Sequence, residues 1–204
     1  MTIYPERASE GEVHRILIGA VVPRPIAFVS TVNAEGLFNV APYSFFNAVC
    51  SDPPVLCFAI AHPSGGSLGA KKDTLSNIEA TGEFVVNIVS EDFAGPMNLT
   101  AGNYAAEVDE FFLSGLTPLK SELVKPPRVG QSRVNFECKL THNILVSDRP
   151  NGSNLILGEA VCIHVAEEVL DGNRIDPDRL RAIGRMGGIS YVRTSVRFEL
   201  ARTK

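Results

Sequence analysis

The chain has 204 residues, enough for one large domain with its own hydrophobic core, and a net charge of −4. Apolar residues make up 45% of it and charged residues 21%, as in soluble globular proteins, and no run approaches the roughly 20 apolar residues of a membrane helix. The 19 basic residues are scattered among 23 acidic ones, which argues against a nucleic-acid-binding surface. We therefore expect one soluble domain, residues 1–204, with neither nucleic acid nor membrane as a partner.

The N-terminal segment, residues 1–12, is acidic and lacks the basic-then-apolar layout of a secretory signal, so we expect a cytoplasmic protein. The four cysteines lie far apart and form no C-x-x-C pair. Buried free thiols in a reducing compartment are the expected state of Cys50, Cys57, Cys138 and Cys162.

The first predicted element is a helix that starts at the capping-box spacing of Ser9 and Glu12 and ends before Pro23. A hairpin follows, with strands at 25–32 and 37–41 joined by a turn at 33–36. The next stretch, 39–56, is apolar enough for one continuous strand, yet proline, serine, asparagine and aspartate interrupt it at 42–47 and 52–54. The interruption indicates a backbone that is needed for something other than sheet pairing.

Buried strands are predicted at 55–61 and 83–89, with a loop at 62–71 and a helix at 73–81 between them. Gly82 is the expected C-terminal glycine of that helix. The segment 91–112 is predicted to be irregularly helical, 134–146 and 154–169 to form a long hairpin, and 192–200 to form a last strand. Strands dominate without a regular alternation of strand and helix, so we expect a mainly β fold, a closed or split β-barrel with accessory helices.

Two common nucleotide fingerprints are absent. The glycines at 65–69 follow a strand and precede a helix, but their spacing fits neither the dinucleotide-binding loop nor the P-loop. A metal site is not expected either. Cys138 with His142, or Cys162 with His164, could share a strand face, but a structural zinc needs four ligands with loop spacing.

A candidate anion site lies at the start of the helix at 73–81. A helix start offers free backbone N–H groups to a phosphate, Lys72 adds a charge and Thr74 a hydroxyl. Taken alone, such residues more often cap a helix or face solvent. Considered in isolation, Ser30 and Thr31 are likewise ordinary sheet or turn residues, and Arg24 is a surface arginine.

The order of these motifs changes that interpretation. Together they resemble the flavin reductase-like family with the FMN-binding split-barrel fold, in its flavoredoxin-like branch, over nearly the whole chain. The motifs are 24–31 (RPIAFVST), 36–47 (GLFNVAPYSFFN), 53–54 (PP), 72–78 (KDTLSNI), 83–87 (EFVVN), 109–111 (DEF), 127–129 (PRV), 137–138 (EC) and 184–188 (GRMGG).

The resemblance implies FMN held at the edge of a barrel in a homodimer. The interrupted stretch would run along the flavin, because Pro42 removes one sheet donor and the turn frees other backbone groups for a ligand. The resemblance assigns the contacts to the flavin ring and ribityl chain to Asn39, Ala41, Ser44, Phe45, Phe46 and Asn47. It assigns the phosphate to Ser30, Thr31, Lys72 and Thr74, less directly to Arg24, and a contribution from the second subunit to Arg185. Core packing is the alternative for Phe45 and Phe46.

The function implied by the resemblance is that of an NAD(P)H-dependent flavin reductase. FMN would be either a fixed cofactor or a substrate released to another enzyme, such as a monooxygenase. An electron carrier that exchanges electrons with protein partners is the main alternative, and a flavin-free assembly module is a third. No acid or base is obligatory for hydride transfer to a flavin, so the sequence assigns no catalytic residue.

Overall fold

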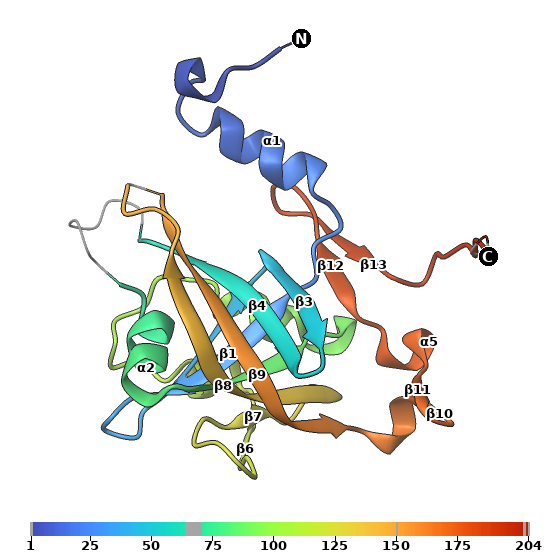
Figure 1. The fold of residues 1–204 in the computed structure, drawn as a ribbon. Helices are drawn as coiled ribbons and strands as arrows, with labels where there is room; N and C mark the ends of the chain where they lie inside the picture. Colours follow the sequence, from blue (N-terminus) through green and yellow to red (C-terminus); the bar gives the residue numbers. More distant parts are fainter. Residues whose placement is uncertain (1, 64–70, 150, 202, 204) are drawn as a thin grey trace.

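The computed structural model describes residues 2–63, 71–149, 151–201 and 203. Its main feature is an antiparallel sheet of seven strands in the order β2-β1-β5-β8-β9-β4-β3 (Figure 1). The strands are β1 (Ala27–Val32), β2 (Phe38–Tyr43), β3 (Phe46–Ser51), β4 (Pro54–Ala61), β5 (Glu83–Ile88), β8 (Val134–Leu145) and β9 (Ser153–Val165). The expected mainly β, split-barrel architecture is confirmed.

The split in the barrel lies at a two-residue link. β2 and β3 are the two edges of the sheet, yet only Ser44 and Phe45 separate them in the chain. The sheet therefore curls until its edges meet at this corner, where the Phe45 carbonyl accepts a hydrogen bond of 2.9 Å from the Ala59 amide of β4. The interruption in the stretch 39–56 is thus the point where the chain passes from one edge to the other.

The helices sit outside the barrel. They are α1 (Glu12–Ala20), α2 (Asp73–Thr81), α3 (Ala94–Leu99), α4 (Glu110–Ser114) and α5 (Pro177–Leu180), with 3₁₀ turns η1 (Pro5–Arg7), η2 (Glu91–Phe93) and η3 (Glu167–Val169). Gly82 ends α2 in the left-handed conformation (φ 68°), as predicted. The Ser9 amide and hydroxyl both donate to the Glu12 carboxylate, but α1 begins only at Glu12 with Gly11 before it, so the predicted start at Ser9 is too early.

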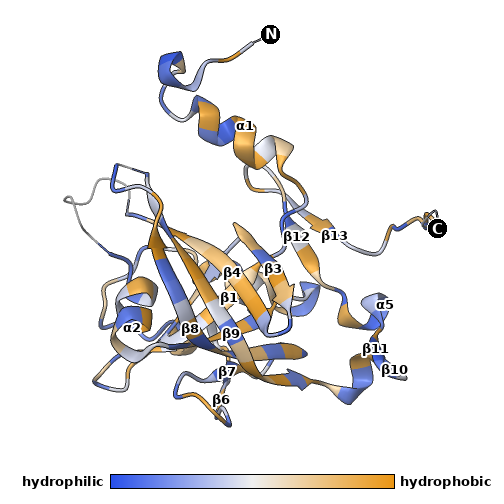
Figure 2. Ribbon diagram, viewed as in Figure 1, coloured by the Kyte–Doolittle hydropathy of each residue, from blue (hydrophilic) through white to orange (hydrophobic). Residues whose placement is uncertain are grey.

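Three two-stranded sheets complete the fold: β6 (Pro118–Leu119) with β7 (Arg128–Val129), β10 (Leu170–Asp171) with β11 (Arg174–Ile175), and β12 (Ile183–Arg185) with β13 (Tyr191–Arg193). The predicted strand at 192–200 is wrong beyond Arg193. Val196, Phe198 and Leu200 are 82–94% exposed, so they lack the packing partners that a strand of alternating character requires. As Figure 2 shows, both α1 and this C-terminal arm extend away from the barrel and carry apolar residues.

Two hydrophobic clusters flank β1, whose six residues are all buried. One fills the barrel around Phe58, Phe84 and Ile156, and the other packs the outer face of β1 and β2 against α3 and α4. Gly158 of β9 is required inside the barrel, because a Cβ there would lie 2.3 Å from the Phe84 ring.

The cysteine prediction is confirmed in part. All four thiols are free, but only Cys138 is buried, and burial raises its pKa to about 12. Cys57 and Cys162 are half-buried, and Cys50 is exposed because β3 is an edge strand. Within the described ranges, no helix combines the length and apolar character needed to cross a bilayer.

Candidate functional site

A cavity of about 500 Å³ lies where β2, the start of α2 and the segment 100–106 meet. This volume is within the range of small-molecule sites. Its lining consists of Asn39, Ala41, Pro42, Tyr43, Pro63, Lys71, Lys72, Asp73, Thr74, Thr100, Ala101, Gly102, Asn103, Tyr104, Ala106 and Glu110. Four residues of the predicted site, Asn39, Ala41, Lys72 and Thr74, are therefore brought together at one cavity.

Hydrogen bonds hold the polar floor of this cavity. The hydroxyl groups of Thr74 and Thr31 both donate to Oδ1 of Asn39, at 2.7 and 3.2 Å. Asn77 donates from Nδ2 to the Thr31 hydroxyl at 3.0 Å, and Asn39 donates from its own Nδ2 to Glu110 at 3.0 Å. Thr31 thus lies behind Asn39 and supports it, because its donor and one acceptor position are already in use.

The start of α2 forms a second wall of the cavity, with Lys71, Lys72 and Asp73. Among the residues that the structure describes, no side chain caps the helix, so its first backbone N–H groups keep their capacity to bind an anion. Lys71 forms an ion pair of 2.5 Å with Glu79, whereas the half-buried Lys72 occupies the position before the helix. Of the residues predicted to bind the phosphate, Lys72 and Thr74 line the cavity.

Two buried polar atoms of cavity residues lack a hydrogen-bond partner within the described part of the chain: the Tyr43 hydroxyl and Oε2 of Glu110. Burial raises the pKa of the Tyr43 hydroxyl far above its ordinary value. Burial, with repulsion from Asp73, also raises the pKa of Glu110. Unpaired buried polar groups are costly, and hydroxyl groups of a ligand would satisfy both. A flavin, with a hydroxylated ribityl chain and a phosphate, fits this set of residues.

Tyr43 and Glu110 were not among the predicted site residues. Each lay inside a quoted motif, 36–47 or 109–111, but nothing in the local sequence indicates that a polar atom will be buried without a partner. A glutamate next to the helix cap Asp109 resembles an ordinary acidic residue of a first helical turn.

A second cavity of about 170 Å³ adjoins the first, and both are lined by Pro42 and Ala101. It contains two further predicted residues, Ser44 and Arg185. The Arg185 guanidinium stacks 4.5 Å from the Tyr191 ring centroid and donates to the Gly188 carbonyl at 2.6 Å. The two cavities together run along the corner where the barrel is split.

Six predicted residues line neither cavity: Thr31, described above, Arg24, described below, and Ser30, Phe45, Phe46 and Asn47. Ser30 donates to the Pro127 carbonyl at 2.5 Å and accepts from Asn87. Phe46 packs against the barrel core, as its alternative interpretation expected, and Asn47 is exposed on β3. Phe45 is 47% exposed, which does not fit core packing.

Arg24 is a buried arginine rather than the surface residue expected of it in isolation, with 5% exposure. Its guanidinium donates to the carbonyl groups of Ile18, Val21 and Met186 at 2.7, 2.8 and 3.0 Å. Burial, followed by repulsion from Arg185, lowers its pKa. Its donors hold α1 and the turn after β12 against the corner, where it also lies 5.9 Å from the Phe45 ring centroid.

The flavin reductase like domain matches residues 14–180 of the chain. The chain belongs to the flavin reductase-like family. An uncharacterized protein of Aquifex aeolicus is 42% identical over 182 residues, 89% of each chain. The structure of nitrilotriacetate monooxygenase component B from Bacillus cereus superposes with a TM-score of 0.92 at 35% identity, covering 98% of both chains. That of the 2-nitrobenzoate 2-nitroreductase NbaA of Pseudomonas fluorescens superposes with a TM-score of 0.88 at 33% identity, covering 100% of this chain and 96% of NbaA.

The resemblance stated from sequence motifs is confirmed at the level of family and fold.

Proposed function

We propose that this protein is an FMN-dependent NAD(P)H oxidoreductase, a flavin reductase that supplies electrons to a partner such as a monooxygenase. The observation that carries the proposal is the cavity at the barrel split, where an uncapped helix start and Lys72 face two buried polar groups without partners. The name of the B. cereus protein, a monooxygenase component, supports the choice of partner.

FMN is preferred over a flavin without phosphate because of the charges at the cavity. The N–H groups of α2 and the Lys72 ammonium would bind the phosphate, with Thr74 beside them. The ribityl hydroxyl groups would meet Tyr43 and Glu110. At about 0.3 kcal/mol for each of about 31 non-hydrogen atoms, the binding free energy is about 9 kcal/mol, which corresponds to a sub-micromolar Kd.

The corner residues would position the ring. Ala41 lines the larger cavity and Ser44 lines the smaller one. Ser44 lies between β2 and β3, so its backbone is not paired in the sheet. When bound, the isoalloxazine supplies the hydride-accepting chemistry, while the protein supplies position and electrostatics. A nicotinamide must approach to about 3 to 3.5 Å, so one face has to stay accessible.

A second copy of the chain is proposed to complete the site. α1 has no buried residue in the single chain, although Ile16 and Leu17 form an apolar face that is 44% and 47% exposed. The apolar C-terminal arm is exposed as well. A cytoplasmic homodimer that covers these surfaces would also bring partner residues toward the flavin, the role expected for Arg185.

An anaerobic titration with NADH and NADPH tests the proposal. We expect either nucleotide to bleach the bound flavin within seconds, and turnover to continue when oxygen or free FMN is added. Reduction by dithionite but by neither nucleotide over many minutes would favour the electron carrier instead. Colourless protein that does not quench FMN fluorescence at micromolar concentration would reject flavin binding itself.

A further inference from the structure

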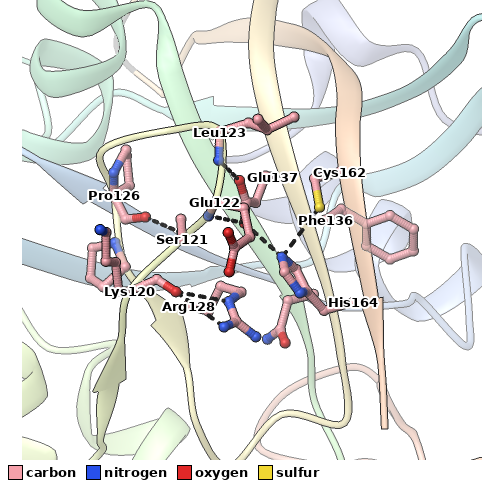
Figure 3. A network of polar contacts seen from close by, with 12 residues as sticks. Lys120, Ser121, Glu122, Leu123, Pro126, Arg128, Phe136, Glu137, Cys162 and His164 are labelled. Atoms are coloured by element: carbon pink, nitrogen blue, oxygen red, sulfur yellow. Dashed lines mark hydrogen bonds and ion pairs between the residues drawn. The ribbon is translucent and has the colours of Figure 1, made fainter. Parts of the chain in front are cut away.

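We propose that Glu137, Cys162 and His164 form a binding site for one divalent transition-metal ion of the Zn²⁺ type, separate from the flavin site. Glu137 of β8 pairs directly with Cys162 of β9, and His164 follows two residues later on the same face. The carboxylate, thiol and imidazole ligand atoms all lie within 4.8 Å of one another (Figure 3). None of the three residues lines either cavity at the corner.

The distances suit tetrahedral coordination. Zinc bonds of about 2.0 Å to nitrogen or oxygen and about 2.3 Å to sulfur give ligand separations of about 3.3 Å between nitrogen and oxygen and about 3.5 Å between nitrogen and sulfur. Cys162 Sγ and His164 Nε2 are 3.4 Å apart. Nε2 and Oε1 of Glu137 are 2.6 Å apart, so this edge has to widen by less than about 1 Å, and Sγ lies within 4.8 Å of the carboxylate ligand atom.

The charge at this position favours a cation. Glu137 is fully buried and accepts hydrogen bonds from the Glu122 and Leu123 amides at 2.8 and 2.6 Å. Within the described residues, the side chain that pairs with this carboxylate is His164, whereas the guanidinium of nearby Arg128 donates to the Lys120 carbonyl (Figure 3).

A proton relay is the competing interpretation of a cysteine, a histidine and a glutamate in contact, and the geometry excludes it. Sγ and the carboxylate both approach Nε2, the same ring nitrogen. A relay that activates the thiol needs the carboxylate on Nδ1 and the thiol on Nε2. Convergence of all three groups on one point is the arrangement that a metal ion requires.

The ion can reach the site and displace its protons. Cys162 and His164 are half-buried, so solvent meets two of the three ligands, and a water would complete the tetrahedron. On binding, the Cys162 thiol proton is released to solvent. The imidazole proton moves from Nε2 to Nδ1, which leaves the Nε2 lone pair for the metal.

Cobalt titration of the full chain, stripped of metal with a chelator, tests the proposal. We expect one Co²⁺ per chain, with tetrahedral absorption bands at wavelengths beyond those of flavin, and displacement of the cobalt by Zn²⁺. Removal of a residue that only supports a metal ligand lowers metal affinity by about 10- to 100-fold. Cys162→Ser removes a ligand itself, so we expect a larger loss of Co²⁺ affinity. His164→Gln should do the same, while the exposed-thiol control Cys50→Ser should bind as the parent does.

Absence of stoichiometric Co²⁺ and Zn²⁺ binding by the parent overturns the proposal. So does a Cys162→Ser variant that keeps the parent's affinity, whatever His164→Gln does. Circular dichroism of Cys162→Ser distinguishes loss of a ligand from loss of fold, and the half-buried position of Cys162 makes a folded variant the expected outcome. The test does not depend on flavin reduction, so its result is independent of the proposed reductase activity.

Discussion

Asn39 donates from its side-chain nitrogen to Oε1 of Glu110 at 3.0 Å, and this bond ties β2 to the first turn of α4 beneath the cavity. The other Glu110 oxygen has no partner within the described residues, and the carboxyl is 6% exposed. The folded chain therefore binds a proton on Glu110 more tightly than the unfolded chain does.

The pH dependence of stability follows from this carboxyl. Because the folded-state pKa of Glu110 is raised above its ordinary 4.5, its favourable contribution is complete below that pH and is lost as pH rises through the folded-state pKa. We expect flavin-free Glu110→Gln, which mimics the protonated form, to gain stability over the parent as pH rises from 4.5 to 8. Denaturant unfolding across that range measures the difference. The exposed Glu107→Gln is the control, and a gain that is independent of pH would contradict the assignment.

The two neighbouring lysines should differ in their effect on FMN. Lys72→Ala should weaken FMN binding by about 1.5 to 3 kcal/mol, the range for a hydrogen bond to a charged group, and leave riboflavin binding nearly unchanged. Lys71→Ala is the matched control, because Lys71 is paired with Glu79. Fluorescence quenching titrations with both flavins measure the effect. Equal losses for FMN and riboflavin would show that Lys72 does not meet the phosphate.

Arg24→Lys tests whether Arg24 acts through structure. A lysine cannot reproduce the fork that reaches three carbonyl groups, so we expect unfolding free energy to fall by about 1.5 to 3 kcal/mol. Thermal or denaturant unfolding of the flavin-free protein measures this loss. An unchanged stability combined with weaker FMN binding would instead place Arg24 at the phosphate.

The apolar face of α1 should carry the dimer contact. Leu17→Glu places a charge on that face, and we expect it to convert a particle of about twice 22.0 kDa into a monomer in light scattering. Leu123→Glu, a change at an exposed leucine outside α1, is the control. A parent chain that is monomeric and still binds FMN tightly would reject the shared site.

Glycine at position 158 should be required for barrel packing. Gly158→Ala forces the new methyl group against Phe84, and overpacking of this kind costs about 1 to 3 kcal/mol. The helical Gly95→Ala, where nothing lies within 4 Å of the new Cβ, should not destabilise the chain. A comparison of their denaturation midpoints checks both expectations.

The sequence predicted those helices and strands whose ends are set by residues within the element or next to it. α2 was predicted to the residue because Gly82 ends it in a conformation that glycine adopts freely. β3 was missed, because an exposed edge strand shows no alternation of buried and exposed residues. The alternation of apolar and polar residues at 194–200 predicts a strand. In the described structure no neighbouring strand pairs with this segment, so it forms an arm instead.

Site residues were predicted where a single helix or strand carries them, and they were missed where two elements have to pack together to form the site. Ser30 and Thr31 were assigned together to the phosphate, but adjacent residues of a strand face opposite sides, and only Thr31 joins the cavity network. Tyr43 and Glu110 depend on the packing of β2 against α4, which the sequence does not reveal. The metal-site ligands are a similar case: sequence spacing offered Cys162 and His164, and the register of β8 against β9 adds Glu137.

The two-residue link between β2 and β3 has a consequence for the order of folding. The link keeps β2 and β3 close from the start, but they become the two edges of one sheet only when the five strands between them in the sheet order have paired. Closure of the barrel is then a late step, because it depends on contacts between distant parts of the chain. A ligand held across that corner would slow amide hydrogen exchange at Ala59, whose amide reaches Phe45, as well as along β2. Cofactor retention and the last step of folding would in this way depend on the same short segment of chain.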